Sequence, residues 1–309
     1  MTSNFWKNKK ILVTGAQGFL GKHLVKNLLE NRRVLKENLF LPAIEELDLR
    51  RWEDCKSAVE NKDMVIHLAA VTGNAEFHRV NQGKTFYDNL IMGVQLMEAA
   101  RQAGIKKFVS IGSVTEYPKK APFPFREDGL WEGYPEEIHA PYSFAKMMLL
   151  VQGKAYRQQY NFNAIHLLLT NMFGPGTSMG NAVIPSVIKK IKEAKEAKRE
   201  FIELWGTGRP TRDFLYVEDA VEGILLAAEK YDKSEPVNIG SGKELSIKSL
   251  ADIICRLMSF SGKVVWDASK PDGQPRWLMD TSLAKKEFGF EAKTAIEEGL
   301  IKTINYEQQ

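Results

Sequence analysis

A tyrosine and a lysine stand four residues apart, at Tyr142 and Lys146, in a segment whose apolar spacing predicts a helix over residues 142–160. On a helix this spacing places both side chains on one face. A phenol has a pKa of about 10 and is a poor base near neutral pH, but a neighbouring ammonium favours the phenolate and lowers that pKa. The pair is therefore a candidate acid–base centre for a hydroxyl or carbonyl substrate.

A serine upstream gives this pair a third partner. Ser113 follows a predicted strand over residues 107–111, in the segment SIGSVTEYP, and its hydroxyl could hydrogen-bond the same substrate oxygen. A Tyr and a Lys at this spacing also occur on helix surfaces without any chemical role. The three side chains in this order are more specific, and we predict Ser113, Tyr142 and Lys146 as the catalytic residues.

A glycine-rich turn near the N-terminus could bind a pyrophosphate. The segment GAQGFLG, residues 15–21, lies between a predicted strand and a predicted helix. Gly15 would allow the tight turn, Gly18 the approach of the ligand to the backbone, and Gly21 the close packing of helix against sheet. The helix N-terminus would add free N–H groups and a positive dipole end. We predict a dinucleotide-binding turn, and hence hydride transfer to or from a nicotinamide.

The end of the second predicted strand favours NAD over NADP. The stretch after Leu41 has no Arg or Lys to pair with a 2′-phosphate, and Glu45 and Glu46 would repel one. Asp48 could accept a hydrogen bond from the adenine amino group, or could only stabilise its loop. NADP stays open as the alternative, because three basic residues could still reach the site: Arg32, Arg33 and Lys36.

The elements that must position these residues alternate between strands and helices. Apolar runs predict strands over 10–14, 38–41, 64–70, 107–111, 164–169 and 201–205, and helical spacing predicts helices over 19–30, 85–103, 142–160, 185–199 and 217–230. This alternation predicts an α/β fold with a Rossmann-type doubly wound parallel sheet. We expect a dinucleotide-binding domain over 1–171, to which some later segments return, and a smaller C-terminal substrate-binding lobe over 172–309. The proline-rich stretch 118–141 is a long loop of the kind that is functional or disordered.

Composition excludes several classes of protein. The net charge of +4 at pH 7 suits an anionic small ligand but is too small to indicate nucleic-acid binding. Two cysteines, Cys55 and Cys255, make no disulfide framework, and no apolar run has the length of a membrane helix or signal-peptide core. The five histidines form no metal-ligand pattern. We expect a cytoplasmic protein with no metal and no membrane partner.

From end to end the chain resembles the extended short-chain dehydrogenase/reductases that act on nucleotide sugars, the NAD-dependent epimerase/dehydratase family. The resemblance rests on GAQGFLG (15–21), HLAA (67–70), SIGSVTEYP (110–118), PYSFAK (141–146), TNMFGPG (170–176), WGTGRPTRDFLYVEDA (205–220), NIGSG (238–242) and PDGQPR (271–276). The nearest branch is that of the GDP-L-fucose synthases, which are 3,5-epimerases and 4-reductases. The resemblance implies a GDP-sugar as the favoured substrate, and a homodimer in which two predicted helices of each subunit form a four-helix bundle.

The resemblance also implies roles for individual residues. Ser113, Tyr142 and Lys146 correspond to the catalytic triad of the family. Cofactor contacts fall on Gly15, Gln17, Gly18, Phe19, Leu20, Gly21, Asp48, Leu49, Leu68, Ala69 and Ala70, together with Tyr142 and Lys146. Substrate contacts fall on Asn171, Val183, Val187, Lys190, Trp205, Arg212 and Arg276. Among these, Trp205 would stack by the guanine and Arg212 would clamp the pyrophosphate with its guanidinium. Trp205 could instead be a core residue, and Arg212 could pair with a neighbouring Asp.

Two departures from the branch bear on the chemistry. Fucose synthases use a Cys two residues after the catalytic Ser, and a His ahead of Val-Ile-Pro, to move protons at C3 and C5. Thr115 stands at the Cys position, and residues 180–182 read Gly-Asn-Ala before Val183. A neutral Thr hydroxyl cannot replace a thiol in carbanion chemistry, so we expect Thr115 to be at most an accessory residue and the 3,5-epimerase activity to be missing. Val114 and Thr115 also stand where dehydratases have Asp-Glu, which disfavours dehydration.

Redox chemistry at C4 is what remains. We expect a 4-keto-sugar reductase of the fucose-synthase type that lacks the 3,5-epimerase activity. The alternatives are a 4-epimerase with retained NAD, since UDP-galactose 4-epimerases also carry Thr at the position of Thr115, and a full GDP-L-fucose synthase. The last would need a relocated acid and base, for example His139 or the neighbours of Asn181. A non-catalytic, cofactor-sensing protein of the same fold is a more distant alternative.

Overall fold

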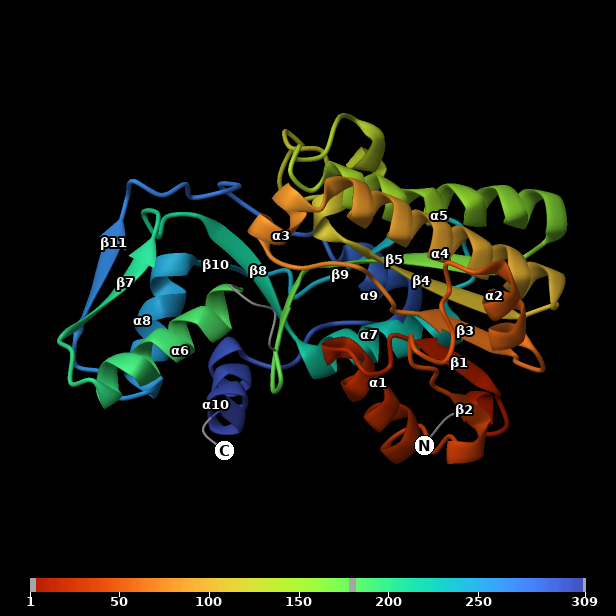
Figure 1. Cartoon of the computed structure of the whole chain (residues 1–309), viewed down its shortest axis with the longest axis horizontal. Coiled ribbons are helices and arrows are strands. Elements are labelled where there is room, and N and C mark those ends of the chain that lie inside the picture. Colours follow the sequence, from red (N-terminus) through yellow and green to blue (C-terminus); the bar gives the residue numbers. More distant parts are fainter. Residues whose placement is uncertain (1–3, 178–181, 308–309) are drawn as a thin grey trace.

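The computed structural model describes residues 4–177 and 182–307, and its largest element is a sheet of six parallel strands (Figure 1). The strands lie in the order β2-β1-β3-β4-β5-β9. Their bounds are β1 Ile11–Thr14, β2 Leu39–Phe40, β3 Met64–His67, β4 Lys107–Ser113, β5 Ala164–Leu169 and β9 Val237–Ile239. Every residue of β1, β3 and β5 is buried, as expected of parallel strands covered on both faces.

Helices cover both faces of this sheet. One face carries α1 (Phe19–Glu30), α7 (Val217–Lys230) and α9 (Ser282–Phe288), and the other carries α2 (Trp52–Val59), α4 (Gln82–Gln102) and α5 (Ala140–Tyr160). Alternate side chains of β1 pack against the two helix layers. Ile11 and Val13 belong to the apolar cluster of α1 and α7, and Leu12 belongs to that of α2 and α4. The predicted doubly wound parallel sheet is therefore confirmed.

A smaller lobe lies beside the main sheet, on the left of Figure 1. It contains a three-stranded sheet of β6 (Asn171–Phe173), β8 (Thr211–Tyr216) and β10 (Glu244–Ser246), and a pair of strands, β7 (Phe201–Trp205) and β11 (Lys263–Asp267). Its helices are α6 (Val183–Glu196), α8 (Ile247–Leu257) and α10 (Ile296–Glu307). These elements share an apolar cluster of their own. Three later segments lie instead with the main sheet, namely α7, β9 and α9.

Short elements connect the layers. They are the helix α3 (Ala75–Val80) and the 3-10 helices η1 (Asn4–Trp6), η2 (Lys36–Asn38), η3 (Val114–Glu116) and η4 (Glu127–Trp131). The long loop expected over 118–141 is tied to the C-terminal part of the chain, because the backbone N–H of Phe125 donates to Leu278 at 2.7 Å and Asn238 donates to the carbonyl of Phe125 at 2.9 Å. Across the described ranges, no helix combines the length and apolar character needed to cross a bilayer.

Most predicted bounds agree with the structure, and two differences have physical causes. The helix expected over 142–160 begins at Ala140, because Pro141 is accommodated in its first turn, where no backbone N–H is needed. The strand expected over 64–70 ends at His67. The apolar residues that follow it line a cavity and do not extend the sheet.

Candidate active site

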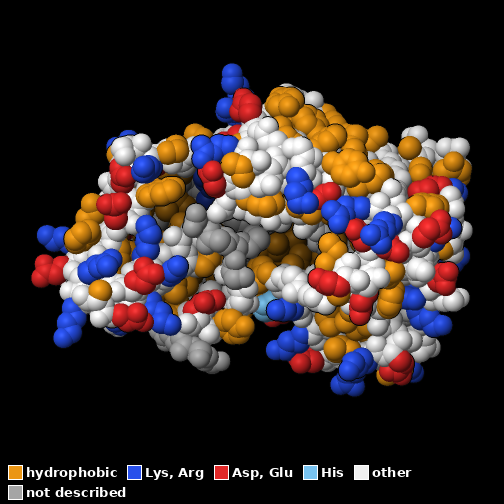
Figure 2. All heavy atoms as spheres, viewed as in Figure 1, with side chains coloured by type: hydrophobic (Ala, Val, Ile, Leu, Met, Phe, Trp, Pro, Cys, Tyr) orange, Lys and Arg blue, Asp and Glu red, His pale blue; other side chains and the backbone are white. Residues whose placement is uncertain are grey.

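Two adjoining cavities open at the carboxyl ends of β1 and β3, where the strand order reverses. This edge is where open α/β sheets bind ligands. The first cavity has a volume of about 420 Å³ and the second about 550 Å³, which are sizes typical of small-molecule sites. Gly15, Ala69 and Ala70 line both, so one long ligand could occupy the two together. Figure 2 shows a hollow at the centre of the view, between the main sheet and the smaller lobe.

The glycine turn has the geometry that a dinucleotide needs. Gly15 has a φ of +68°, and a Cβ there would lie 2.8 Å from the backbone N of Ala69. A Cβ on Gly21 would lie 2.2 Å from the carbonyl oxygen of Gly15, so α1 can approach the turn only because this residue is glycine. Gly18 precedes the first turn of α1 and, like Phe19 and Leu20, lines the second cavity. The residues present therefore fit a dinucleotide with its phosphates at the start of α1.

The first cavity holds the residues expected near an adenosine. Asp48 and Leu49 line it together with Gln17. The guanidinium of Arg50 lies 2.7 Å from the carboxylate of Asp48, and this hydrogen bond lowers the pKa of Asp48 to about 2. Asp48 is therefore an ionised acceptor, as a contact to an adenine amino group requires.

The charged side chains that border this cavity differ from those that the sequence suggested. Neither Glu45 nor Glu46 lines it, and the carboxylate of Glu46 accepts from the backbone N–H of Ala43 at 3.0 Å. Arg32 does not turn towards it either, because its guanidinium lies 2.8 Å from Glu222 on α7. The basic side chains that do line the cavity are Arg50 and Lys84, which the sequence did not indicate.

The predicted catalytic residues meet at the second cavity. Ser113 ends β4, while Tyr142 and Lys146 lie in the first turns of α5, and all three line the cavity wall. The Ser113 oxygen accepts from the backbone N–H of Thr115 at 3.2 Å and from the Thr115 hydroxyl at 3.0 Å. With both acceptor positions used, the Ser113 hydroxyl proton is free to donate into the cavity.

A buried carboxylate supports the serine from behind. Glu116 is fully buried, accepts from the backbone N–H of Ser113 at 2.8 Å, and lies 3.0 Å from Nε2 of His166 on β5. Gly112 makes room for this pair, since a Cβ there would lie 2.4 Å from each partner. In the sequence Glu116 directly follows Val114 and Thr115, the two positions where dehydratases have Asp-Glu. Nothing in its spacing indicated a pairing with a residue fifty positions away.

The protonation of the site differs from the sequence expectation. Burial raises the pKa of Tyr142 above its ordinary value, and the nearby charge of Glu116 raises it further, while a hydrogen bond with Thr72 opposes the shift. Burial lowers the pKa of Lys146 to about 8, with Glu116 acting in the opposite direction. The expected lowering of the phenol pKa is therefore wrong, because burial and the charge of Glu116 raise it and the hydrogen bond with Thr72 does not offset them. Near neutral pH Tyr142 carries its proton and can act as an acid.

The substrate side of the second cavity is formed by the smaller lobe. Asn171 and Val183 line it, as predicted, and Trp277 and Phe214 line it as well. Arg212 does not itself line the cavity, but its guanidinium lies 4.6 Å from the ring centroid of Trp277, which does, in a cation–π contact. Burial lowers the pKa of Arg212 only to about 10, so it stays charged. Within the described residues no carboxylate is in ion-pair contact with it, which contradicts the expected pairing with a neighbouring Asp and leaves its charge available to an anion.

Other predicted substrate residues lie away from this cavity. Val187 is 1% exposed inside the apolar cluster of the smaller lobe, so its side chain is a core residue and not a cavity contact. Lys190 donates to the carbonyl of Glu203, and Trp205 is 63% exposed at the end of β7, which excludes a core role for it. Arg276 is held by Glu244 at 2.6 Å. None of these residues borders the second cavity in the structure.

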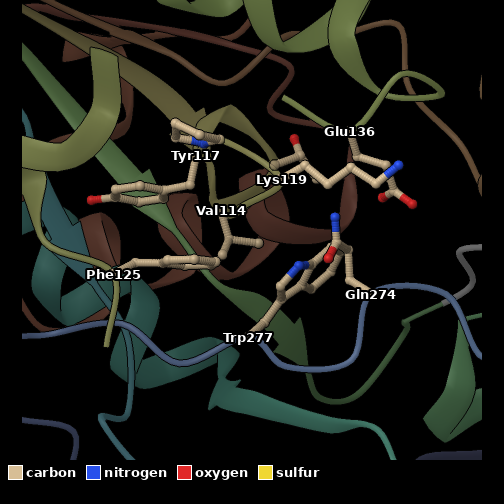
Figure 3. Close-up of a pocket in the computed structure, with 9 residues that line it drawn as sticks. Val114, Tyr117, Lys119, Phe125, Glu136, Gln274 and Trp277 are labelled. Carbon is tan, nitrogen blue, oxygen red and sulfur yellow. The ribbon is translucent and has the colours of Figure 1, made fainter. Parts of the chain in front are cut away.

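A small third cavity of about 10 Å³, with room for about one water, adjoins the second, and Thr115 and Trp277 line both. Figure 3 shows the rings of Tyr117 and Phe125 lying parallel on one side of it, with Trp277 across from them; the stacked centroids are 4.7 Å apart. The proline-rich loop thus contributes packed aromatic walls to the site. No group of three metal-ligating side chains occurs in the part of the chain that the structure describes. The segment around Asn181, named as a possible source of a relocated acid, lies outside the described residues.

The chain is similar to known proteins along nearly its whole length. The chain is 36% identical over 301 residues to the GDP-L-fucose synthase of Sinorhizobium fredii, covering 96% of this chain and 94% of that protein. It is 34% identical over 306 residues to a probable GDP-L-fucose synthase of Oryza sativa, covering 97% and 92%. The solved structure of a GDP-mannoheptose C4 reductase from Campylobacter jejuni with NADP bound superimposes with a TM-score of 0.88 at 26% identity, covering 98% and 99%. The model of the NAD dependent epimerase/dehydratase family matches residues 11–240, and the chain belongs to this family.

Proposed function

We propose that this protein reduces the 4-keto group of a GDP-linked hexose with a nicotinamide dinucleotide as hydride donor. The observation that carries the proposal is the meeting of a protonated Tyr142, a free Ser113 hydroxyl and a buried Lys146 beside a turn built for a dinucleotide. The names of the GDP-L-fucose synthases and of the C4 reductase support GDP as the nucleotide and C4 as the reacting carbon.

The chain's own groups have distinct parts in this reaction. A nicotinamide dinucleotide bound at the glycine turn would supply a hydride for C4. Tyr142 donates its phenolic proton to the C4 oxygen as negative charge develops there, and Ser113 donates a hydrogen bond to the same oxygen. Lys146 is 3% exposed, so its positive charge acts on the resulting phenolate through a medium of low dielectric constant. Arg212, backed by Trp277, is the candidate clamp for the sugar-nucleotide diphosphate.

We further propose NADPH as the reductant, in place of the NAD suggested by the sequence. The Campylobacter jejuni reductase was solved with NADP, and Arg50 and Lys84 border the first cavity, where Asp48 and Asp88 hold them in ion pairs that a 2′-phosphate would have to replace in part. A 2′-phosphate hydrogen-bonded to a guanidinium gains about 1.5–3 kcal/mol.

One assay tests both proposals. The protein is incubated with GDP-4-keto-6-deoxy-D-mannose and either NADPH or NADH, with oxidation followed by absorbance and the product by NMR. We expect turnover with a KM at least tenfold lower for NADPH, and a larger rise of that KM than of the KM for NADH in an Arg50→Ala variant. Absence of keto reduction overturns the function. Conversion of a GDP-hexose into its C4 epimer without added cofactor would instead support an epimerase with retained NAD, the alternative suggested by Thr at position 115.

A homodimer is part of this proposal. Large apolar side chains are exposed along α4 and α5, where the bundle of the resemblance would form: Phe86, Tyr87, Val151 and Tyr160. Figure 2 shows hydrophobic side chains gathered at the top of the view, in the region where Figure 1 places α5 and the loop before it. Light scattering should give twice the 35.0 kDa chain mass, and Tyr87→Lys should shift it towards the monomer. A monomeric wild-type protein contradicts this part. The cytoplasmic location stays a prediction from the sequence.

A further inference from the structure

Gln274 places a side-chain amide at the third cavity, and the reaction described so far does not use it. Gln274 is 9% exposed, and within residues 4–177 and 182–307 no group hydrogen-bonds its amide. Figure 3 shows the amide beside the ring of Trp277, pointing towards Lys119 and Glu136. A buried polar group costs free energy unless it finds a hydrogen-bond partner. The partner of this amide must therefore come from outside the described chain.

The other polar side chains around this cavity are already engaged. Nζ of Lys119 donates to Glu137 at 2.9 Å, and the carboxylate of Glu136 lies 3.1 Å from Nδ1 of His139. The hydroxyl of Thr115 donates to the catalytic serine at 3.0 Å. Among the described side chains that line the cavity, the amide is therefore the group with its full hydrogen-bonding capacity unused.

The backbone next to Gln274 is fixed between the smaller lobe and the proline-rich loop. The carbonyl of Pro275 accepts from the backbone N–H of Thr211 at 3.0 Å, and the backbone N–H of Trp277 donates to Thr211 at 3.1 Å. One residue further on, the same segment accepts from the backbone N–H of Phe125 at 2.7 Å. Little backbone has to be ordered when a ligand meets the amide, which lowers the entropic cost of binding.

The third cavity lies next to the position proposed for the C4 oxygen. Thr115 lines both the second and the third cavity, and its hydroxyl oxygen is 3.0 Å from that of Ser113, the proposed donor to the C4 oxygen. In a hexose the groups nearest to that oxygen are the C3 hydroxyl and C6, which C5 carries. The cavity has a volume of about 10 Å³, enough for one water and therefore for one hydroxyl oxygen.

We propose that the third cavity is a subsite for one hydroxyl of the sugar, on C3 or C6, and that Gln274 determines the preference for sugars that carry it. This inference rests on the proposed reduction at C4. A side-chain amide has a carbonyl acceptor and two N–H donors, so it can accept a hydroxyl proton or donate to a hydroxyl oxygen. A sugar without this hydroxyl leaves the amide unpaired, which costs affinity.

A variant that keeps the shape of the side chain separates this role from packing. Gln274→Met retains the unbranched stem and loses the amide. Because the amide has no partner in the described part of the free protein, the variant should unfold at the wild-type temperature or above it. Its affinity for GDP should stay within about twofold of the wild type. Its affinity for GDP-D-mannose, which has hydroxyls on C3 and C6, should fall about fivefold to twentyfold in titration calorimetry.

Two deoxy sugars identify the hydroxyl that the cavity binds. They are GDP-3-deoxy-D-mannose and GDP-6-deoxy-D-mannose. One of them should bind to the wild type about as weakly as GDP-D-mannose binds to Gln274→Met, and it should lose nothing further in the variant, because both changes remove one contact. Gln158→Met, an exposed change on α5 that borders none of the three cavities, is the matched control and should bind all four ligands as the wild type does.

Three results would overturn the subsite. The first is an equal loss of affinity for GDP and for GDP-D-mannose, and the second is a loss that persists with both deoxy sugars. The third is no loss with any sugar, which would leave a water as the occupant of the cavity. A lower unfolding temperature of Gln274→Met would mean that the amide has a partner within the protein, and this also contradicts the proposal.

Failure of the subsite and failure of the proposed function give different results. If the wild type reduces GDP-4-keto-6-deoxy-D-mannose while Gln274→Met binds every sugar as the wild type does, the subsite alone fails. If Gln274→Met loses the contact with one hydroxyl but the wild type reduces no keto sugar, the proposed reduction fails and the subsite stands as a sugar-binding site.

Discussion

Replacing Tyr142 with Phe should lower the rate of keto-sugar reduction about a thousandfold or more while the protein stays folded. The substitution removes the group that is proposed to transfer its proton to the C4 oxygen, and a positioned general acid contributes about 10²–10⁴ in rate. The ring itself stays, so its contact with His78 at 5.2 Å is kept. Among the described residues, the side-chain hydrogen-bond partner that the phenol loses is Thr72, whose hydroxyl can turn to water. Stopped-flow or steady-state oxidation of the reductant, with cofactor binding measured by fluorescence, checks both halves of this expectation.

The control is Tyr134→Phe. Tyr134 is 61% exposed in the loop before α5 and lies 5.1 Å from the ring of Phe144, a contact that Phe would keep. It should retain the wild-type rate. A Tyr142→Phe variant that reduces the substrate at close to the wild-type rate would remove Tyr142 from the acid role. A wild type that binds the dinucleotide but shows no turnover with any sugar nucleotide would favour the cofactor-sensing alternative.

The parts of the site that follow from backbone geometry could be predicted from the sequence. Gly15 has a left-handed backbone conformation, and Gly21 lets α1 pack closely against the turn. Both requirements are met by glycine, so the residue type alone indicates them. Ser113, Tyr142 and Lys146 could be found because a strand end and a helix face fix where their side chains begin. The alternation of short apolar strands and amphipathic helices likewise predicts the doubly wound sheet without knowledge of any contact.

The parts that depend on tertiary packing could not be predicted. Whether Val187 faces a cavity or the core depends on how α6 rotates against α8, and its sequence neighbourhood is compatible with both. Arg50 and Glu45 are five positions apart, yet only Arg50 lines the first cavity. The direction of the Tyr142 pKa shift could not be predicted for the same reason. Burial of the phenol depends on the whole fold, whereas the sequence spacing shows only that Lys146 is four residues away. His78 lies on the six-residue helix α3, and Thr72 lies just before it. This helix is too short for a helical spacing of apolar residues to show in the sequence.

The buried charges explain why the site suits reduction. Glu116 lies under Ser113 and its charge opposes ionisation of Tyr142 while favouring the ammonium of Lys146. A carboxylate placed there keeps the phenol as an acid before reaction and keeps a cation beside it afterwards. Without bound ligands Tyr142 therefore holds its proton, which is the form that a keto reduction needs at its start.

The last expectation concerns C3 and C5 of the sugar, where no deuterium should appear when the reaction is run in D2O. Exchange at these carbons requires a base that takes a proton next to the 4-keto group and an acid that returns one on the other face. Thr115 occupies the position of the fucose-synthase thiol, and its hydroxyl donates to Ser113 at 3.0 Å, while Ser143 donates to the backbone carbonyl of Thr115 at 2.8 Å and lies 3.2 Å from its hydroxyl oxygen. Its proton and a lone pair are thus committed to other groups, and an alkanol has no accessible anionic form near neutral pH.

NMR of the product should therefore show the substrate configuration kept at C3 and C5, with exchange at least about a hundredfold slower than reduction. The GDP-L-fucose synthase of Sinorhizobium fredii, run in parallel, serves as the comparison, and the substrate in D2O without protein gives the background. Stoichiometric deuterium at C3 and C5 would mean that another pair of groups moves these protons, with His139 the first to replace because it lines the same cavity. Thr115→Cys should increase deuterium exchange at one carbon at most. The thiol would supply only one of the two groups that exchange needs, the base or the acid. Ser113, which lies beside it, remains engaged at the C4 oxygen.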